Sequence, residues 1–209
     1  MSKAERRDQS FGQLHPLSLL DKLGNFLSLR IISRRVKKLD ESKKGHLLDL
    51  GSGFHARISS PFFKEFKLVS LIDVQVSPVL LNENKNIKAY AQDALIALKS
   101  IEDESVDFLL AINVLEHLSC RDEIILEIRR ILKVEGKAVV QVPTWKSQKF
   151  LEPLAFQLNL VPKAEIEDHK IYFDSKSLWT LLRGGGFLPS EIRIKYRKFR
   201  LVLVAYLSR

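Results

Sequence analysis

The sequence predicts an α/β fold, a doubly wound and mostly parallel sheet of seven strands with a C-terminal antiparallel hairpin and an N-terminal helical extension. Short apolar runs alternate with helical patterns between residues 46 and 142, which is typical of parallel strands joined by crossovers. The last two runs are joined by a link too short for a crossover, so they should pair as antiparallel neighbours. The 209 residues, 45% apolar and 28% charged, have the composition of one ordinary globular domain.

The first 45 residues are expected to form the helical extension, and residues 46–209 the main domain. Apolar residues recur at helical spacing over residues 16–39, and the Arg and Lys residues near the end suit a helix C-terminus. Gly24-Asn25 is a candidate break. Two interpretations stay open: a helix packed on the domain, which we favour, and a basic helix lying on a membrane surface.

The elements of the main domain follow from the apolar pattern. The expected strands are residues 46–50, 67–74, 87–91, 106–112, 137–142, 191–197 and 199–207. Helical stretches are expected at 56–65, from Ser77-Pro78, at 122–132 and at 175–183. Residues 144–170 hold aromatic residues and prolines without a clear period, so we expect them to form a cap over an acceptor site.

Positive charge is concentrated at the two ends of the chain. The formal charge is +9; residues 1–45 hold 11 basic and 5 acidic side chains, and residues 190–209 hold 6 and 1. The nearly neutral middle argues against a DNA-binding groove through the domain. Charged and apolar residues alternate over 191–197, so we favour a strand with one solvated face, and a patch for anionic lipid, glycan or RNA is the alternative.

A cytoplasmic protein is expected. Cys120 is the single cysteine, so an internal disulfide and a thiolate zinc site are both excluded, and no metal site is predicted. The first residues lack the apolar core of a secretory signal, and no run approaches the roughly 20 apolar residues of a membrane-spanning helix. Membrane association, if it occurs, should be peripheral.

A glycine-rich turn is the strongest local signal for a ligand. Leu48-Asp49-Leu50-Gly51-Ser52-Gly53 runs from a strand into a tight turn, where glycine lets the backbone turn and a ligand approach closely. Asp73 closes the next strand, and an acid at this distance can accept hydrogen bonds from both hydroxyls of a ribose. Together these residues predict a nucleoside cofactor at the carboxyl ends of the strands. A tight turn without a ligand and a helix-capping Asp are the structural alternatives.

Further segments resemble, in order, the motifs of the class I S-adenosylmethionine-dependent methyltransferases. They are residues 48–53, 72–74, 92–94, 106–118 and 132–137, followed by Gly186-Phe187 before the terminal hairpin. The chain is most similar to the small-molecule branch (type 11/23-like), and the resemblance runs from about residue 45 to 207. It implies a Rossmann-like fold, a methyltransferase activity and S-adenosylmethionine as the cofactor.

The resemblance also implies a role for each matching residue. Asp49, Gly51, Ser52 and Gly53 would line the methionine end of the cofactor, with Asp49 near its ammonium group. Asp73 would accept from the ribose hydroxyls, Val74 would lie against the adenine, and Asp93 beside Ala94 would accept from the adenine amino group. Asn113 would sit where methyl donor and acceptor meet. The chain departs from the family at His55, where a third small residue is common.

Two histidines are candidate general bases for a hydroxyl acceptor, since histidine has a suitable pKa. His117 follows the fourth strand, and His169 follows Asp168 in the expected cap. A structural histidine beside the sheet and a surface loop residue are the respective alternatives. Glu116 is a candidate hydrogen-bond partner.

The expected acceptor is a small molecule, a sugar or a glycolipid, methylated on O or N. The apolar character of residues 144–170 favours such acceptors over a folded RNA. A nicotinamide-dependent oxidoreductase is the first rival, but its fuller three-glycine spacing is missing. The second is a catalytically inactive relative that uses the basic ends to bind a membrane surface or RNA.

Overall fold

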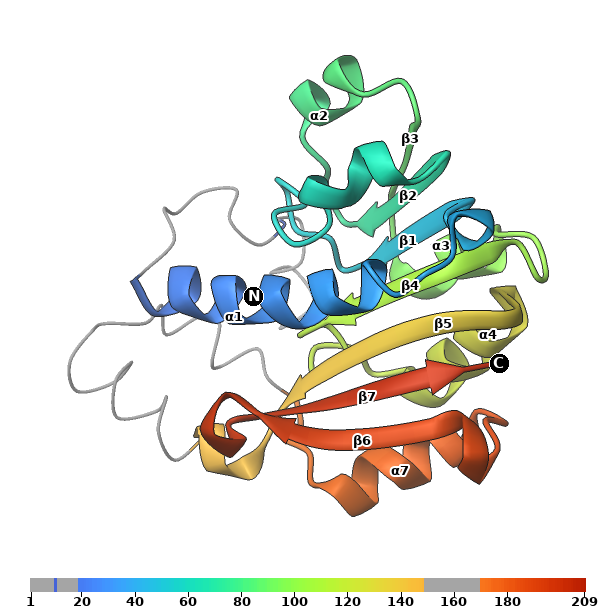
Figure 1. Ribbon diagram of the computed structural model, residues 1–209. Helices are drawn as coiled ribbons and strands as arrows, with labels where there is room; N and C mark the ends of the chain where they lie inside the picture. Colours follow the sequence, from blue (N-terminus) through green and yellow to red (C-terminus); the bar gives the residue numbers. More distant parts are fainter. Residues whose placement is uncertain (1–9, 11–18, 149–169) are drawn as a thin grey trace, which may run out of the picture.

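One seven-stranded sheet organises the chain in the computed structural model, which describes residues 10, 19–148 and 170–209 (Figure 1). The strand order is β3-β2-β1-β4-β5-β7-β6. The strands are β1 (His46–Leu50), β2 (Leu68–Asp73), β3 (Ile87–Ala91), β4 (Val106–Ile112), β5 (Leu132–Pro143), β6 (Ile192–Arg197) and β7 (Val202–Ser208). The first five are parallel, and β7 pairs antiparallel with both β5 and β6. The predicted doubly wound sheet with its terminal hairpin is therefore confirmed.

Helices cover both faces of this sheet. On one face, Ile32 and Val36 of α1 (Leu19–Val36) and Phe62 and Phe63 of η3 (Ser60–Glu65) pack against strand residues such as Phe108. On the other face lie α3 (Ala94–Lys99), α4 (Arg121–Ile131) and α7 (Ser175–Gly184). The helix α2 (Pro78–Glu83) follows Ser77, as predicted. The short 3₁₀ helices are η2 (Glu41–Lys43), η4 (Pro189–Glu191) and η5 (Lys198–Arg200), and residues 145–148 are also helical.

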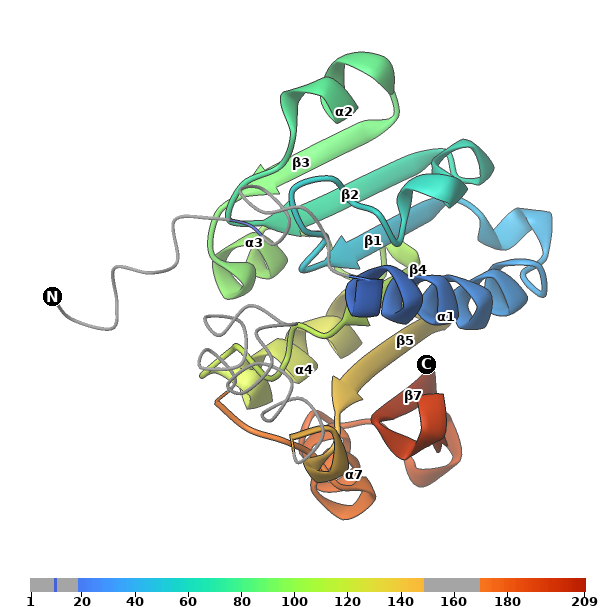
Figure 2. The same cartoon turned by 90° about the vertical axis from the view of Figure 1, so that its left-hand side faces the viewer.

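Because β1 to β5 are parallel, their carboxyl ends share one edge of the sheet, which we call the carboxyl edge. In Figure 1 this edge lies to the left, together with the N-terminal part of α1 and the turn between β6 and β7. Figure 2 looks onto that edge, with the arrowhead of β5 toward the viewer. Ligands of open α/β sheets bind at such an edge.

Three local predictions need correction. Residues 56–59 do not begin a helix: Ala56 has a φ of 44°, and only the 3₁₀ segment η3 forms, with Pro61 at its start. The N-terminal helix does not break at Gly24, because α1 runs through it. The helix α3 was not anticipated, and it begins where Asp93 caps it.

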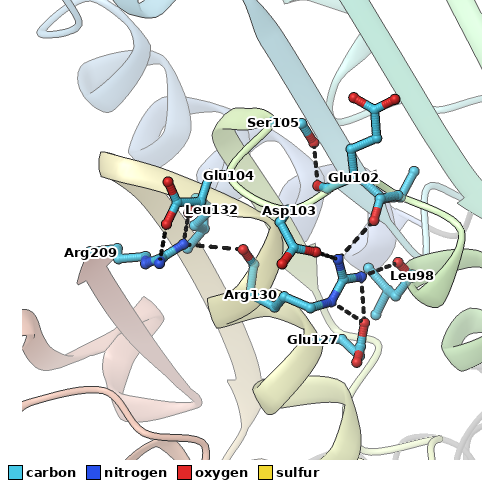
Figure 3. Close-up of polar contacts among 10 residues, drawn as sticks. Leu98, Glu102, Asp103, Glu104, Ser105, Glu127, Arg130, Leu132 and Arg209 are labelled. Atoms are coloured by element: carbon cyan, nitrogen blue, oxygen red, sulfur yellow. Dashed lines mark hydrogen bonds and ion pairs between the residues drawn. The ribbon is translucent and has the colours of Figure 1, made fainter.

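The opposite edge of the sheet is held by two arginines (Figure 3). Arg130 of α4 donates to the carbonyls of Leu98 and Ile101, both at 2.9 Å, and pairs with Glu127 and Asp103. Arg209 donates to the carbonyl of Leu132 at 2.5 Å and pairs with Glu104. These contacts join α3, α4 and the end of β7 at the edge remote from the predicted ligand site.

None of the described helices is long and apolar enough to cross a membrane. The predicted cap at 144–170 falls mainly on residues 149–169, outside the described part of the chain. Its described ends are Thr144 and Lys170, and Phe173 forms a parallel bridge with Thr144.

Candidate active site

A buried carboxyl lies at the carboxyl edge, in the middle of the sheet. Asp49 is the next-to-last residue of β1, which lies between β2 and β4, and its Oδ2 has no hydrogen-bond partner among the described residues. Burial raises the pKa of Asp49 to about 7; the nearby charge of Asp73 also raises it, and a hydrogen bond from Ser59 lowers it. A buried acceptor without a partner is costly, which makes this oxygen a candidate for a cationic ligand group.

The turn that follows Asp49 is shaped by its two glycines. Gly51 and Gly53 have φ values of 72° and 69°, in the left-handed region that side chains disfavour. The N–H groups of Gly51 and Ser52 donate to the carbonyl of Ile72 at 2.8 and 3.2 Å, which folds the turn over the end of β2. A Cβ at Gly51 would lie 2.5 Å from Cγ2 of Val114, so Gly51 is also needed for close packing.

The predicted ribose acid, Asp73, contacts this turn directly. Gly53 N–H donates to Asp73 Oδ2 at 2.7 Å, and Val74 N–H donates to Oδ1 at 2.8 Å. The Ser10 hydroxyl donates to the same Oδ1, lies 2.5 Å from the carbonyl oxygen of Gln75 and accepts from Gln75 N–H at 2.8 Å. A hydroxyl from the N-terminal region thus occupies a carboxylate oxygen that the resemblance assigns to ribose. Sequence reasoning missed Ser10, because nothing local marks it.

The predicted adenine acid, Asp93, lies at the same edge, beyond the end of β3. Its Oδ1 accepts from Leu95 N–H at 2.9 Å and Ile96 N–H at 3.3 Å, which makes it the N-cap of α3. Ala94 is the first residue of that helix. Asp93 is exposed, so a capping role leaves its second oxygen accessible to a ligand.

Asn113 directly follows β4, and the next residue, Val114, lies against Gly51 of the glycine turn. Asn113 has a φ of 53°, which Asn tolerates better than most residues, and its side chain is exposed. Its Oδ1 accepts from Nε2 of Gln141 at 3.0 Å, and its N–H donates to the carbonyl of Gln141 at 2.9 Å. This pair fixes the amide of Asn113 toward the next strand.

A second buried carboxyl follows Asn113. Glu116 is buried, its Oε2 has no partner among the described residues, and burial raises its pKa to about 7. The charge of the neighbouring His117 opposes that rise. Lys170 N–H donates to the backbone carbonyl of Glu116 at 2.9 Å, so the chain at Lys170 lies against the backbone of this residue. The sequence predicts only a hydrogen-bond partner at Glu116, and the available signal for more was an acid that follows the apolar pair Val114-Leu115 after β4.

The two predicted bases differ in what the structure says of them. His117 is half-buried, and its N–H donates to the carbonyl of Val114 at 3.1 Å within the turn after β4. His169 lies outside the described residues. Asp49, the glycine turn and Asp73 are joined by hydrogen bonds or charge, and Val114 links the turn to the segment of Asn113 and Glu116.

These residues fit a nucleoside that carries an amino acid with a free ammonium group, such as S-adenosylmethionine. The partnerless oxygen of Asp49 suits an ammonium group, and the carboxylate of Asp73 suits vicinal hydroxyls. The left-handed glycines leave the backbone open between them.

Comparison with known proteins gives the same indication. Residues 48–140 match the family described as "Methyltransferase domain". The chain is 32% identical over 183 residues to an uncharacterized protein of Methanocaldococcus jannaschii, covering 85% of this chain and 75% of that protein.

Two solved structures share the fold at low identity. A SAM-dependent methyltransferase from Archaeoglobus fulgidus is 14% identical, with a TM-score of 0.63 over 91% of this chain and 100% of that one. The Haemonchus contortus phosphoethanolamine N-methyltransferase 2, in complex with phosphomonomethylethanolamine and S-adenosylhomocysteine, is 18% identical. Its TM-score is 0.60 over 83% of this chain and 39% of that one.

Proposed function

We infer, from the premise that this chain belongs to the class I S-adenosylmethionine-dependent methyltransferases, that it methylates O or N of a small molecule, sugar or lipid-linked acceptor. The observation that carries the inference is Glu116, a buried carboxyl that follows β4 by four residues and whose Oε2 has no partner among the described residues. Such a group suits an acceptor that must lose a proton when it takes up a methyl group.

Different residues at the carboxyl edge would bind different groups of the cofactor. Asp49 would hold the ammonium group of the cofactor, Asp73 its ribose hydroxyls and Asp93 its adenine amino group, while Val74 would lie against the base. When bound, S-adenosylmethionine supplies a methyl group that its sulfonium has already activated. The protein must then mainly orient the acceptor and exclude water.

Glu116 is the proposed general base. Its pKa of about 7 means that near neutral pH a substantial fraction is ionised and able to accept a proton at Oε2. His117, next in the chain, would stabilise the ionised form when it is protonated. Asn113 would position the acceptor through the amide that Gln141 orients.

Calorimetry and a transfer assay test this proposal together. S-adenosylhomocysteine should bind the wild type, and Asp49→Asn should weaken binding at least tenfold, since it removes the charge that meets the ammonium group. With S-adenosylmethionine labelled in its methyl group, transfer into fractions of a cell extract should identify the acceptor class: lipid, water-soluble metabolite or RNA.

Glu116→Gln is the variant that tests the base. It should keep S-adenosylhomocysteine binding and lose transfer by roughly 10²-fold or more, whereas the exposed Glu83→Gln should change neither. Wild-type transfer should rise with pH through about 7, as Glu116 ionises. Full transfer by Glu116→Gln contradicts the base. Cofactor binding without transfer to any fraction favours the second candidate, an inactive relative that binds a membrane surface or RNA.

A further inference from the structure

The outward side of α1 combines apolar and basic side chains. Ser28, Ile32 and Val36 face the core, while Phe26 and Leu23 are 59% and 54% exposed. Exposed basic residues continue the same side of the helix, namely Lys22, Arg30 and Arg34, and the exposed Lys38 follows its end. Residues 22–39 contain no acid. A helix that shows large apolar residues to solvent beside cations is unusual for a purely structural role.

The edge strand β6 adds basic side chains on the same side of the sheet. Arg193, Lys195 and Arg197 lie opposite Tyr206, Val204 and Val202 of β7, which pack on the α1 side. The alternate residues Ile192 and Ile194 pack on the other side. The guanidinium of Arg35 lies 3.7 Å over the ring of Tyr206, between α1 and the hairpin. Helix and strand therefore present one basic face.

The turn between β6 and β7, which contacts α1, exposes an aromatic ring to solvent. Phe199 is 89% exposed, and Lys198, Phe199 and Arg200 have φ values of 48°, 56° and 68°. Three successive left-handed residues without glycine are costly, and such backbone strain is concentrated at functional positions.

The turn is also anchored. Lys198 Nζ donates to the carbonyl of Gly24 at 2.8 Å and to Oγ of Ser28 at 2.7 Å, both in α1. On the other side, Thr144 Oγ1 donates to the carbonyl of Arg200 at 2.9 Å. Phe199 is thus presented by a fixed turn, and its exposure is not the result of a loose loop.

We propose that this face, formed by the outward side of α1 and the β6–β7 turn, docks on an anionic phospholipid membrane. The phosphate headgroups complement basic side chains that, within the described residues, form no ion pair with an acid: Arg30, Arg34, Arg193, Lys195 and Arg197. Phe199, Phe26 and Leu23 enter the boundary between headgroups and acyl chains. RNA would neutralise the cations but would leave the aliphatic and aromatic groups of α1 in water, so lipid is the better match.

The docking face adjoins the active site. It shares the carboxyl edge in Figure 1, and Ser28, which binds Lys198, donates to Oε1 of Gln141 at 3.3 Å. Gln141 in turn orients Asn113. Docking would bring the active site to the membrane surface, where lipid-linked acceptors are found. This choice of acceptor rests on the proposed function, whereas the docking itself does not.

Vesicle flotation tests the docking face. The protein should float with phosphatidylcholine vesicles that contain about one third phosphatidylglycerol, and it should be released by salt and by removal of the anionic lipid. Arg30→Gln/Arg34→Gln should weaken this binding by on the order of tenfold. Phe199→Asn should weaken it severalfold, and Asn tolerates the left-handed backbone at this position.

Matched variants lie on other surfaces. Lys99→Gln/Lys176→Gln removes the same charge from α3 and α7, on the other face of the sheet, and Ile96→Asn removes an apolar group that is 62% exposed on α3; both should float like the wild type. A wild type that stays with the unbound fraction overturns the proposal, as does equal loss in test and control variants. So does tight binding of a single-stranded RNA oligonucleotide without vesicle binding.

Calorimetry with S-adenosylhomocysteine separates the two proposals. The docking variants should retain wild-type cofactor affinity, because none of their side chains lies among the proposed cofactor-binding residues. A protein that floats but does not bind S-adenosylhomocysteine defeats the proposed function and leaves the docking face standing. A protein that binds it and does not float defeats the docking face alone.

Discussion

Replacing Glu116 by Gln should make the protein less sensitive to pH as well as less active. The pKa of this carboxyl rises from 4.5 to about 7 on burial, and each pKa unit corresponds to 1.36 kcal/mol. The folded state therefore carries a cost of about 3 kcal/mol when Glu116 is ionised in both states. Glu116→Gln removes that cost.

The sign of the pH dependence follows from proton counts. Below pH 4.5 the carboxyl is protonated in both the folded and the unfolded chain. In that range this group makes no contribution to the pH dependence of the free energy of unfolding. Between pH 4.5 and about 7 the unfolded chain releases the proton while the folded chain keeps it, so the free energy of unfolding falls as pH rises. Asp49, raised from 3.8 to about 7, adds a similar fall, which the Glu116→Gln variant retains.

Urea unfolding at pH 5 and pH 8 measures this difference. From pH 5 to pH 8, the wild type should lose about 2–3 kcal/mol more unfolding free energy than Glu116→Gln. The buried amide of Gln has its own cost of about 1–3 kcal/mol, but that cost is the same at both pH values and cancels. Glu83→Gln is the control and should follow the wild type. Parallel curves for the wild type and Glu116→Gln would refute the assignment of a buried, neutral carboxyl.

Three further substitutions probe other contacts. Ser10→Ala frees the Oδ1 of Asp73 from a competing hydroxyl and should tighten S-adenosylhomocysteine binding severalfold in calorimetry. Gly51→Ala places a Cβ 2.5 Å from Val114 at a φ of 72° and should lower the free energy of unfolding by about 1–3 kcal/mol. Adding Val114→Ala should restore part of that loss. Arg130→Ala removes charged hydrogen bonds to two carbonyls and should cost about 2–3 kcal/mol in urea unfolding without changing cofactor affinity.

Each of these expectations has a contrary result. Weaker S-adenosylhomocysteine binding by Ser10→Ala would mean that Ser10 supports the bound state. Strict additivity of Gly51→Ala and Val114→Ala would show that the two positions do not press on each other. Loss of cofactor binding in Arg130→Ala would contradict the separation of the two edges of the sheet.

The fold was largely predictable because its signals are local and periodic. The strands β1, β2 and β4 are buried on both faces, so they appear as apolar runs. The link between β6 and β7 is too short for a crossover, so these two strands must form an antiparallel hairpin. The helix predicted at 56–65 does not form as one element, because Ala56 adopts a left-handed backbone conformation that an α-helix cannot contain. The short helix α3 was missed because its signal is one capping residue, Asp93, which we assigned to a ligand.

The site was predictable only where sequence spacing carries it. The turn and Asp73 lie at fixed distances along the chain, and the structure brings Gly53 N–H to the Asp73 carboxylate at 2.7 Å. Ser10 reaches the same carboxylate from 63 positions away, and no pattern in the sequence encodes that approach. The burial of Glu116 likewise depends on tertiary packing, which the residue type alone opposes.

The place of β7 between β5 and β6 has a consequence for synthesis of the protein. During translation, β5 leaves the ribosome well before β7, so the backbone groups on the outer edge of β5 stay unpaired while α7 and β6 are synthesised. The sheet can therefore be completed only after β7 has been synthesised. Until then the apolar edge of β5 is open to pairing with other chains, and we expect chaperones that bind extended apolar segments to improve the yield of folded protein.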